Sequence, residues 1–471
     1  MSDNQKGLEA EILIEKLVHR GAGLGRIDGQ VCLVPFTVPG DLVKVQVTKR
    51  RSGMVEAEVA EIIGLGPGRT HPKCEVFGRC GGCQWQHIAY DRQPEFKAEV
   101  LLDTFRRIAG LELPKPQVIS GDAWQWRARI ELHASRQGLL GFYAAGSHDI
   151  VEHDSCPIAW PELSELITPI RRLVAKFPPP DKATIELVAG ADRKVVAVIR
   201  GYKTPEIAKK LSRVPGISGV HAQVAGPGWV SFGQKLVRWD VPGPDGTIPM
   251  QLDPRGFSQA NPGLNAQLVS TVVLAADPDD KVLELYAGAG NITVPLVMQN
   301  NQVVAVEVNR QALLACQSFL QHRGKTAEFI PGKVDTVVKT LIGRHFDLLI
   351  ADPPRTGLGP VTEQIVKLAP TKIALVSCEP STLARDLKVL TNAGYIIDST
   401  TVIDMFPQTW HIESIVLLSK RASRFLRSST NVPVPNTETL EALAEVAAMK
   451  KSPDESKGYT DVDQMMKELL E

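Results

Sequence analysis

From Lys281 onward, short apolar runs typical of strands alternate with segments typical of helices. The apolar runs lie in KVLELYAGAGN, VVAVEVN, HFDLLIADPPR and IALVSC, and a later run, SIVLLS, supplies a further strand. Strands separated by helices in this way predict a doubly wound parallel sheet. Sheets of this kind place their chemistry at the carboxyl ends of the strands. The residues that end these runs are therefore the first candidates for a functional site.

Cys378 ends the fourth run, just before a sharp turn at Glu379–Pro380. Ser381 is the predicted N-cap of the helix that follows, which runs through Leu383 and Leu387. The dipole of a helix lowers the pKa of a thiol at its N-terminus, as a nucleophile requires. A lone cysteine is also a common core residue. Position alone therefore leaves two interpretations of Cys378 open, a nucleophile and a buried structural thiol.

A glycine loop, Gly288-Ala-Gly290-Asn291, follows the first strand and opens a helix, so its backbone N–H groups can face a ligand. Glu307 ends the next strand, where an acid can bind ribose hydroxyls. The third glycine position of the dinucleotide motif is Thr293, and no second mononucleotide-binding half is evident. An adenosyl cofactor therefore fits this loop better than a dinucleotide.

The third strand ends in Asp352-Pro353-Pro354-Arg355. The rigid Pro-Pro step holds backbone groups toward the ligand crevice at the edge of the sheet. Enzymes that methylate amines use a similar turn that ends in an aromatic residue, which grips a planar base. Arg355 occupies that place, which argues against nitrogen as the methyl acceptor.

Three cysteines, Cys74, Cys80 and Cys83, form a C-x5-C-x2-C pattern. Thiolates at this spacing in a cytosolic chain bind a metal or an iron–sulfur cluster. Zinc usually takes two short pairs of ligands, and only one is present. The candidates for a fourth ligand are His71, His87 and the distant Cys156.

Residues 8–63 contain five short β-rich runs separated by glycine turns, which predict a small barrel of the OB type. A basic cluster lies on and after one of these strands and suits either a nucleic-acid backbone or a charge-protected edge strand. Cys32 is expected in the core. A helix is expected over 91–110, and the β-rich region 124–255 predicts an antiparallel platform with the cysteines at its edge. The basic cluster is Lys44, Lys49, Arg50 and Arg51.

The 471 residues suggest about three domains, and we expect boundaries at 1–66, 67–255, 256–422 and an acidic tail at 423–471. Residues 431–471 hold nine acids and four lysines, a net charge of −5, so the other 430 residues carry +5. Two short helices are expected in the tail, at 439–449 and 462–470. No apolar run approaches a membrane span, and the first residues lack a signal peptide. We therefore expect a cytoplasmic, monomeric protein that has no contact with a membrane.

Taken together, these motifs resemble the RNA uracil-C5 methyltransferases, which make 5-methyluridine in tRNA or ribosomal RNA. The resemblance covers about residues 7–420 and includes FSQANP (257–262), LYAGAGN (285–291), DPPRTGL (352–358), SCEPSTLARDL (377–387) and QTWHIESI (408–415). It implies an N-terminal TRAM domain, a central domain with an iron–sulfur cluster, and a Rossmann-like catalytic domain that uses S-adenosylmethionine. An RNA substrate is the implied partner.

The resemblance also implies a role for each matching position. Cys378 would be the nucleophile and Glu413 the base. A [4Fe-4S] cluster would be carried by Cys74, Cys80, Cys83 and Cys156. S-adenosylmethionine would be contacted by Gln259, Tyr286, Asn291, Glu307, Asp335 and Asp352. Two positions depart from the family pattern, namely Glu379 in place of the usual Asn and Ala287 in place of a common Cys. A carboxylate beside a thiolate disfavours its ionisation unless the carboxylate points away.

The chemistry of uracil independently requires such a pair of residues. C5 of uracil attacks a methyl sulfonium only after a thiolate has added at C6. A base must then remove the C5 proton before the cysteine can leave. His411 is the competing base, because on an alternating strand it shares a face with Glu413. The target uridine must also leave its base stack, which suits a separate RNA-binding barrel.

Two rival functions remain open from the sequence. The first is an RNA cytosine-C5 methyltransferase, an activity that commonly uses a second cysteine after a proline of the third strand's motif, where this chain has Arg355. The second is a catalytically silent iron–sulfur protein that binds RNA or senses redox state. The methyl transfer itself needs no electron, so we expect any cluster to be structural or to position RNA.

Overall fold

The computed structural model describes residues 8–420, apart from residues 52, 225 and 227. The described residues all belong to one compact unit. The helices expected at 439–449 and 462–470 lie outside the described residues. Among the described helices, none has the length and apolar character needed to cross a membrane.

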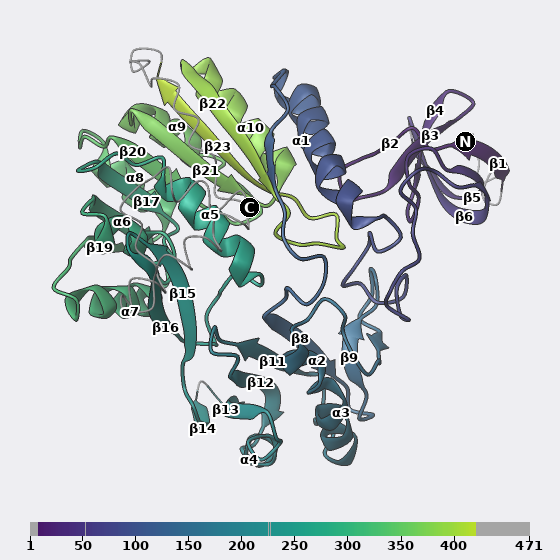
Figure 1. Ribbon diagram of the computed structural model, residues 1–471, viewed down its shortest axis with the longest axis horizontal. Helices are drawn as coiled ribbons and strands as arrows, with labels where there is room; N and C mark the ends of the chain where they lie inside the picture. The colour runs from purple at the N-terminus through teal and green to yellow at the C-terminus, as the bar shows by residue number, and fades with distance from the viewer. Residues whose placement is uncertain (1–7, 52, 225, 227, 421–471) are drawn as a thin grey trace, which may run out of the picture. The chain divides into compact units, whose positions relative to one another are not determined.

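The N-terminal region folds as one six-stranded sheet in the order β1-β5-β6-β4-β3-β2 (Figure 1). The backbone N–H of Glu15 donates to the carbonyl of Leu24 (2.7 Å) and so connects the end of β1 to β3. The sheet has six strands where five were predicted, and one of the six, β2, is only two residues long. Closure of the sheet into a full barrel stays a prediction. The strands are β1 (Glu9–Leu13), β2 (Lys16–Leu17), β3 (Gly23–Ile27), β4 (Gln30–Val34), β5 (Leu42–Arg51) and β6 (Met54–Gly64).

The basic residues of this sheet lie on β5, which is paired with β1 on one side and β6 on the other. The edge-strand interpretation is therefore wrong for Lys44, whereas Lys49, Arg50 and Arg51 lie beyond the residues that pair with β1 and are paired only with β6. Lys44 pairs with Glu9 of β1 (2.6 Å) and Arg51 with Glu56 of β6 (3.1 Å). Cys32 is fully buried in the small core of this sheet, as predicted.

The predicted helix at 91–110 is confirmed as a 3-10 turn, η1 (Tyr90–Arg92), followed by α1 (Gln93–Ala109). Proline at position 94 suits the first turn of a helix, and Gly110 ends it with a φ of 71°. α1 packs along α10 (Pro380–Asn392) and against β22 (Tyr395–Ile403) of the eight-stranded sheet that holds the predicted nucleophile and base, called the catalytic sheet below (Figure 1). The cysteine-bearing segment thus precedes a helix that belongs to the core of the catalytic region.

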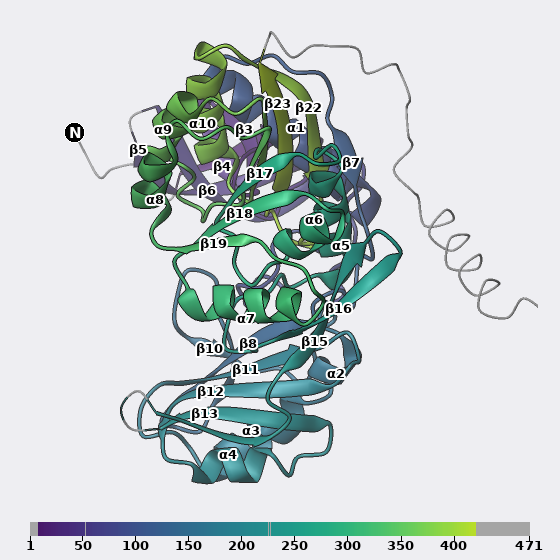
Figure 2. The same ribbon diagram turned by 90° about the vertical axis from the view of Figure 1, so that its left-hand side faces the viewer.

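The central region is a seven-stranded sheet, β10-β9-β8-β11-β12-β13-β14, with α3 and α4 packed on it (Figure 2). The predicted antiparallel platform is wrong for one pair, because β12 and β13 run parallel. The chain passes through α4 between these two strands, and a helical crossover returns it in the same direction. The elements are β8 (Arg129–Ala134), β9 (Leu140–Tyr143), β10 (Ile150–Val151), α2 (Pro161–Ser164), α3 (Ile167–Lys176), β11 (Ala183–Ala189), β12 (Val195–Lys203), α4 (Glu206–Leu211), β13 (Ile217–Val224) and β14 (Trp229–Gly233).

The catalytic sheet has eight strands in the order β19-β18-β17-β20-β21-β23-β22-β7. β18, β17, β20 and β21 are mutually parallel, as predicted, and β19, which was not predicted, extends them in the same direction. The prediction is wrong for β23, which runs antiparallel to both β21 and β22. β7, from the region expected to belong to the central domain, pairs with β22 at the edge. The strands are β7 (Gln117–Ile119), β17 (Lys281–Leu285), β18 (Gln302–Glu307), β19 (Glu328–Pro331), β20 (Leu348–Ala351), β21 (Lys372–Ser377) and β23 (Glu413–Lys420).

Helices cover both faces of this sheet (Figures 1 and 2). One face packs against α1, α8, α9 and α10, and the other against α5, α6, α7 and the hairpin β15–β16. Near-continuous burial of β17, β18, β20 and β21 follows from this double cover, whereas β19 at the edge is more exposed. The remaining elements are β15 (Val237–Gly243), β16 (Gly246–Leu252), α5 (Pro262–Val273), α6 (Thr293–Met298), α7 (Arg310–Gln321), α8 (Val334–Leu341) and α9 (Val361–Leu368).

The N-cap of α10 differs from the predicted one. Glu379, not Ser381, is the cap, and its carboxylate accepts a hydrogen bond from the Ser381 backbone N–H (3.3 Å). Pro380 then occupies the first helical position, which its fixed φ favours. Cys378 consequently lies between the end of β21 and the cap of α10.

Candidate active site

The parallel order of the catalytic strands brings the predicted site residues to one edge of the sheet. Asp352 follows β20, and Cys378 follows the neighbouring β21. β23 runs the other way, so its first residue, Glu413, starts at the same edge, where Ser414 pairs with Ser377. The nucleophile and the base predicted from sequence are therefore carried by adjacent strands.

The Cys378 thiol lies among charged groups of both signs. Burial raises its pKa to about 11, and the negative charges of Glu413 and Asp352 add to this effect. The Arg355 guanidinium acts in the opposite direction, through its charge and a hydrogen bond to the thiol. Arg355 is thus the group at this edge that favours the thiolate.

Glu413 is 2% exposed, and burial together with the charge of Asp352 raises its pKa well above the usual range. Burial likewise raises the pKa of Asp352. Two carboxyl groups this close in a buried site disfavour double ionisation. The pair is therefore suited to holding and releasing a proton beside Cys378.

His411 does not lie on the strand, so the prediction that it shares a strand face with Glu413 is wrong. β22 ends at Ile403 and β23 begins only at Glu413, and Gln408 within the connecting loop has a φ of 68°, which no strand accommodates. Burial lowers the pKa of His411 to about 3, and nearby cations, Arg355 first among them, contribute. The imidazole is therefore neutral and a weak base.

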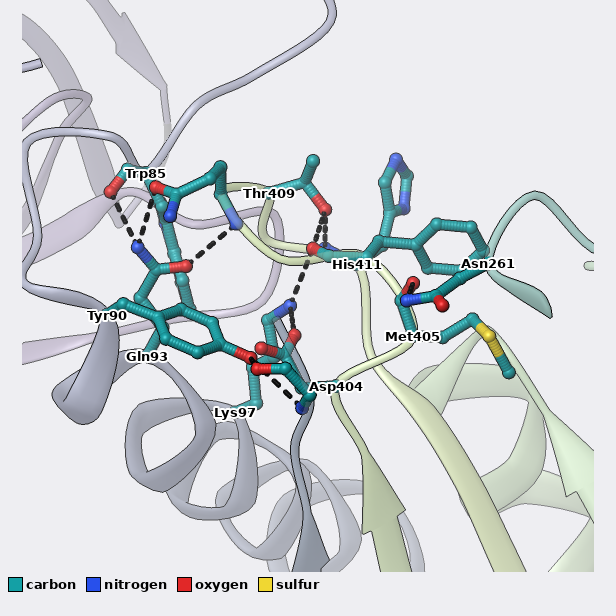
Figure 3. Close-up of polar contacts among 12 residues, drawn as sticks. Trp85, Tyr90, Gln93, Lys97, Asn261, Asp404, Met405, Thr409 and His411 are labelled. Atoms are coloured by element: carbon teal, nitrogen blue, oxygen red, sulfur yellow. Dashed lines mark hydrogen bonds and ion pairs between the residues drawn. The ribbon is translucent and has the colours of Figure 1, made fainter. Parts of the chain in front are cut away.

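The loop 404–412, which leads into Glu413, is held by α1 through a buried polar network (Figure 3). The Lys97 ammonium pairs with Asp404, both side chains being fully buried, and also donates to the carbonyl of Phe406 (3.0 Å). Gln93 donates to Gln408 Oε1 (3.0 Å) and accepts from the Gln408 backbone N–H (2.9 Å). The position of the loop before the base is thus fixed from a different part of the chain.

The cysteine segment contributes directly to the same loop. The backbone N–H groups of Gln84 and Trp85 both donate to the carbonyl of Gln408, at 3.1 and 3.0 Å. Gln84 immediately follows Cys83. The chain around the cysteines and the chain before Glu413 are therefore connected by backbone hydrogen bonds.

The glycine loop lies between β17 and α6, at the same edge of the sheet as Cys378. Glu307, at the end of β18, accepts from the Gly288 N–H (3.0 Å) and the Asn309 N–H (2.7 Å). Tyr286 enters the loop with a φ of 63°, and a Cβ added at Gly288 would meet no atom within 4 Å. The loop therefore leaves open space next to an acid, as a nucleoside ligand requires.

The other predicted cofactor residues differ in how they meet this loop. The Asn291 amide forms reciprocal hydrogen bonds with Asn265 (2.9 and 2.8 Å), so it fixes the loop to α5. Asp335 is exposed in the first turn of α8, and its charge reaches Tyr286. Gln259 lies between β16 and α5, two residues before the Asn261 cap. Glu284, which was not predicted as a site residue, is buried beneath the loop. Its carboxylate accepts a hydrogen bond from the Thr293 hydroxyl (2.5 Å).

Four cysteines line a single small pocket, together with Arg127 and Gln86. Gly81 N–H donates to the Tyr143 carbonyl (2.9 Å), which places this segment beside β9, near the edge of the central sheet. In the described part of the chain, no three or more His, Cys, Asp or Glu side chains form a group that could hold a metal ion. His71 and His87 line a different pocket. The cysteines are Cys74, Cys80, Cys83 and Cys156.

Several residues of this site carry no clear signal in the sequence. The sequence predicts for Arg355 only an argument against a nitrogen acceptor, although its position after the Asp-Pro-Pro turn places it at the correct edge of the sheet. Gln93, Lys97 and Asp404 give no such signal, because they meet only when α1 packs on the catalytic sheet.

Comparison with known proteins agrees with this architecture. The family model described as tRNA (Uracil-5-)-methyltransferase matches residues 230–326 and 339–421, and a TRAM domain model matches residues 4–60. The solved structure of Pyrococcus abyssi tRNA (uracil-54, C5)-methyltransferase in complex with S-adenosyl-L-homocysteine has the same fold. It superposes with a TM-score of 0.68 at 24% identity and covers 87% of this chain and 100% of that one.

Two curated relatives are similar over most of their length. Each is described as 23S rRNA (uracil(1939)-C(5))-methyltransferase RlmD. The protein of Halomonas elongata is 32% identical over 437 residues, which cover 87% of this chain and 89% of the relative. That of Alkalilimnicola ehrlichii is 32% identical over 434 residues, with 88% and 97% covered. With its TRAM domain and the family match across the catalytic region, the chain belongs to the RNA uracil-C5 methyltransferase family.

Proposed function

We propose that the chain transfers a methyl group from S-adenosylmethionine to C5 of a specific uridine in RNA through a covalent bond between Cys378 and C6. The observation that carries this proposal is the convergence of Cys378, Glu413 and Arg355 at one edge of the sheet. Uracil needs a nucleophile for C6 and a base for the C5 proton, and adjacent strands supply one of each.

The residues divide the reaction between them. The Cys378 thiolate adds to C6, and the electron pair of the C5–C6 double bond moves to form an enolate. S-adenosylmethionine, when bound, supplies the electrophilic methyl group for C5. Glu413 then takes the C5 proton, the electron pair re-forms the double bond, and the C6–S bond breaks to return the thiolate. Arg355 lowers the pKa of the Cys378 thiol through its charge and a hydrogen bond, and so stabilises the thiolate before addition and after release.

Glu413 is a better base than His411 for a physical reason. Burial raises the affinity of a carboxylate for a proton and lowers that of an imidazole, because each group avoids a buried charge. The pKa of Glu413 is raised, whereas that of His411 is lowered to about 3. His411 would therefore hold an abstracted proton poorly.

For the cofactor, we propose that the open loop at Gly288 holds the nucleoside. Glu307 would bind the ribose hydroxyls, and the remaining groups would line the rest of the site. The hydrogen bond from the Gly288 N–H to the Glu307 carboxylate and the free space at Gly288 support this proposal. The remaining groups are Gln259, Tyr286, Asn291, Asp335 and Asp352.

For the RNA target, we propose a uridine of 23S ribosomal RNA. Both relatives described above are named for uracil 1939 of that RNA. A target in tRNA, the substrate in the name of the structural neighbour, is the alternative. The TRAM domain would hold the RNA while the target base leaves its stack. The cytoplasmic location and the monomeric state of the protein stay predictions from the sequence.

We also propose that the four cysteines carry a [4Fe-4S] cluster. Each cysteine binds a different iron in such a cluster, so the sulfurs surround a volume and do not converge on one point. The four thiols line one pocket, which is the arrangement that the ligands of one cluster require. Cys156, not His71 or His87, shares that pocket, which supports it as the fourth ligand.

The test is to incubate unmodified 23S rRNA and tRNA with the protein and methyl-labelled S-adenosylmethionine, and then to analyse the nucleosides by mass spectrometry. Labelled 5-methyluridine in one RNA is expected, and fragment mapping would name its position. Cys378→Ala should abolish labelling while it retains cofactor binding, and Cys32→Ala is the matched control. Labelled 5-methylcytidine would favour the cytosine rival. RNA binding without label would favour the silent iron–sulfur factor.

A further inference from the structure

Glu379 follows the nucleophile directly, yet its carboxylate is directed to other partners. It accepts hydrogen bonds from the Ser381 N–H (3.3 Å) and the Ser381 hydroxyl (2.7 Å). Nε2 of His19 lies 3.0 Å from Oε1 of the same carboxylate, a polar contact between the two side chains. The charges that shift the pKa of Cys378 come instead from Glu413, Arg355 and Asp352. The orientation of Glu379 thus spares the thiol an adjacent negative charge.

His19 reaches this position from the TRAM domain, on the turn between β2 and β3. Its ring meets Trp410, in the loop before Glu413, edge-on with centroids 5.6 Å apart. The side chains of His19 and Glu379 are only 24% and 17% exposed. The contact is therefore partly shielded from water, which strengthens the attraction between a polar group and a carboxylate.

The turn that carries His19 is fixed against the catalytic region. Trp85 Nε1 donates to the carbonyl of Gly21 (3.1 Å), and the Gly21 N–H donates to Val18 within the turn (2.8 Å). Gly21 has a φ of 81°, and a Cβ there would lie 2.6 Å from atoms of Trp85 and Trp410. Only glycine allows this close approach.

The His19 ring can direct an N–H group toward Glu379 in its neutral form. Burial lowers its pKa, and the charges of Arg20 and Arg107 also lower it, although Glu379 opposes them. Nδ1 is buried and has no hydrogen-bond partner among the described residues, as expected when the ring proton is on Nε2. The interaction therefore does not require a charged imidazole.

We propose that His19 is a positioning residue for the methyl-transfer site, whose imidazole holds the Glu379 carboxylate at the TRAM domain and away from the Cys378 thiol. Docking of the TRAM domain and reactivity of the nucleophile are then coupled through one polar contact. The inference rests on the proposed role of Cys378 as the nucleophile. It adds a residue from outside the catalytic domain to the control of that nucleophile.

The test measures the rate at which iodoacetamide alkylates Cys378, resolved by peptide mass spectrometry, between pH 7 and 10. His19→Ala should slow alkylation several-fold at each pH below the thiol pKa; a tenfold loss would correspond to a shift of about one pKa unit. His19→Gln retains a donor and should recover much of the rate. Far-ultraviolet circular dichroism and thermal unfolding verify that each variant is folded.

A double variant separates positioning from docking alone. In His19→Ala/Glu379→Gln the negative charge is gone, so alkylation should return to the rate of Glu379→Gln alone. A folded His19→Ala with an unchanged rate, or a double variant as slow as His19→Ala, would overturn the proposal. The assay uses no RNA, so failure of this proposal is distinct from failure of the proposed function, which would show as methylation by Cys378→Ala.

Discussion

Gln93 and Gln408, 315 residues apart in the chain, are joined by two hydrogen bonds that connect the start of α1 to the loop before Glu413. The Gln93 amide also donates to the carbonyls of Trp85 (3.1 Å) and Ile88 (2.9 Å). One fully buried side chain therefore ties the segment after the cysteines to the loop that positions the base (Figure 3). This relationship makes the position of the base dependent on the start of α1 and on the segment after the cysteines.

Replacing Gln93 by Ala should destabilise the protein and slow removal of the C5 proton. The change leaves several buried backbone groups without partners, at a cost of about 1–3 kcal/mol in the free energy of unfolding. A displaced base leaves the enzyme trapped after methyl transfer, so the covalent protein–RNA adduct should accumulate. Urea unfolding and gel electrophoresis of the adduct measure the two effects. Gln46→Ala, an exposed change on β5, is the control. Unchanged turnover in folded Gln93→Ala would contradict this reasoning.

Replacing Lys97 by Met should be among the most destabilising single changes in the chain. Asp404 would then be a buried carboxylate without its cation, which costs about 3–5 kcal/mol. The double variant Lys97→Met/Asp404→Leu removes both charges and should regain a large part of that loss. Urea unfolding measures the free energy of unfolding of the two variants. Equal stability of both would mean that the charge of Asp404 is not the cause.

The parts of the site that were predictable from the sequence are those that strand ends bring together. Cys378 and Asp352 each follow an apolar run, and parallel strands end at one edge of a sheet. The N-cap prediction failed because Ser381 resembles a common cap, while Pro380 at the first helical position shifts the cap to Glu379. The strand assigned to His411 failed because the chain turns at Gln408.

The contacts that hold the site depend on packing between distant segments. His19 meets Glu379, and Lys97 meets Asp404, only after α1 and the TRAM domain have docked on the catalytic sheet. Neither histidine nor lysine at such a position differs, by local pattern, from a surface residue. β7 likewise joins the catalytic sheet from a region whose pattern belongs to the central domain. Local periodicity contains no information on such pairings.

Replacing Arg355 by Gln should reduce the reactivity of Cys378. In the wild type, alkylation and methylation should rise with pH from 7 to 9, because the pKa of the thiol is near 11 and each step exposes more thiolate. Without the guanidinium the pKa rises further, so the rate falls at every pH in this range, about tenfold per pKa unit. Arg355→Lys keeps a charge and should fall between the two. A rate independent of residue 355 would remove Arg355 from the proposed mechanism.

Glu413→Gln should form the covalent adduct and fail to release it, whereas His411→Gln should still turn over. The amide cannot take the C5 proton, so the reaction stops after methyl transfer, with Cys378 bonded to C6. The neutral His411 ring, with its lowered pKa, is not expected to replace the carboxylate. Denaturing gels with labelled RNA measure the adduct, and nucleoside analysis measures release. Free turnover by Glu413→Gln, with loss in His411→Gln, would reverse the two roles.

Cys156→Ser should lose bound iron and sulfide, and His87→Asn should keep both. Cys156 lines the pocket of the other three cysteines, whereas the His87 ring is bonded to the Thr37 carbonyl (3.3 Å) and lines another pocket. Anaerobically purified variants can be compared by iron and sulfide content and by visible absorption. Cys32→Ser, in the TRAM core, controls for the loss of any one thiol.

Because the backbone N–H groups of Gln84 and Trp85 donate hydrogen bonds to the Gln408 carbonyl, removal of iron with a chelator should also increase hydrogen exchange in the loop 404–412. Iron retained by Cys156→Ser and lost by His87→Asn would make the histidine the fourth ligand.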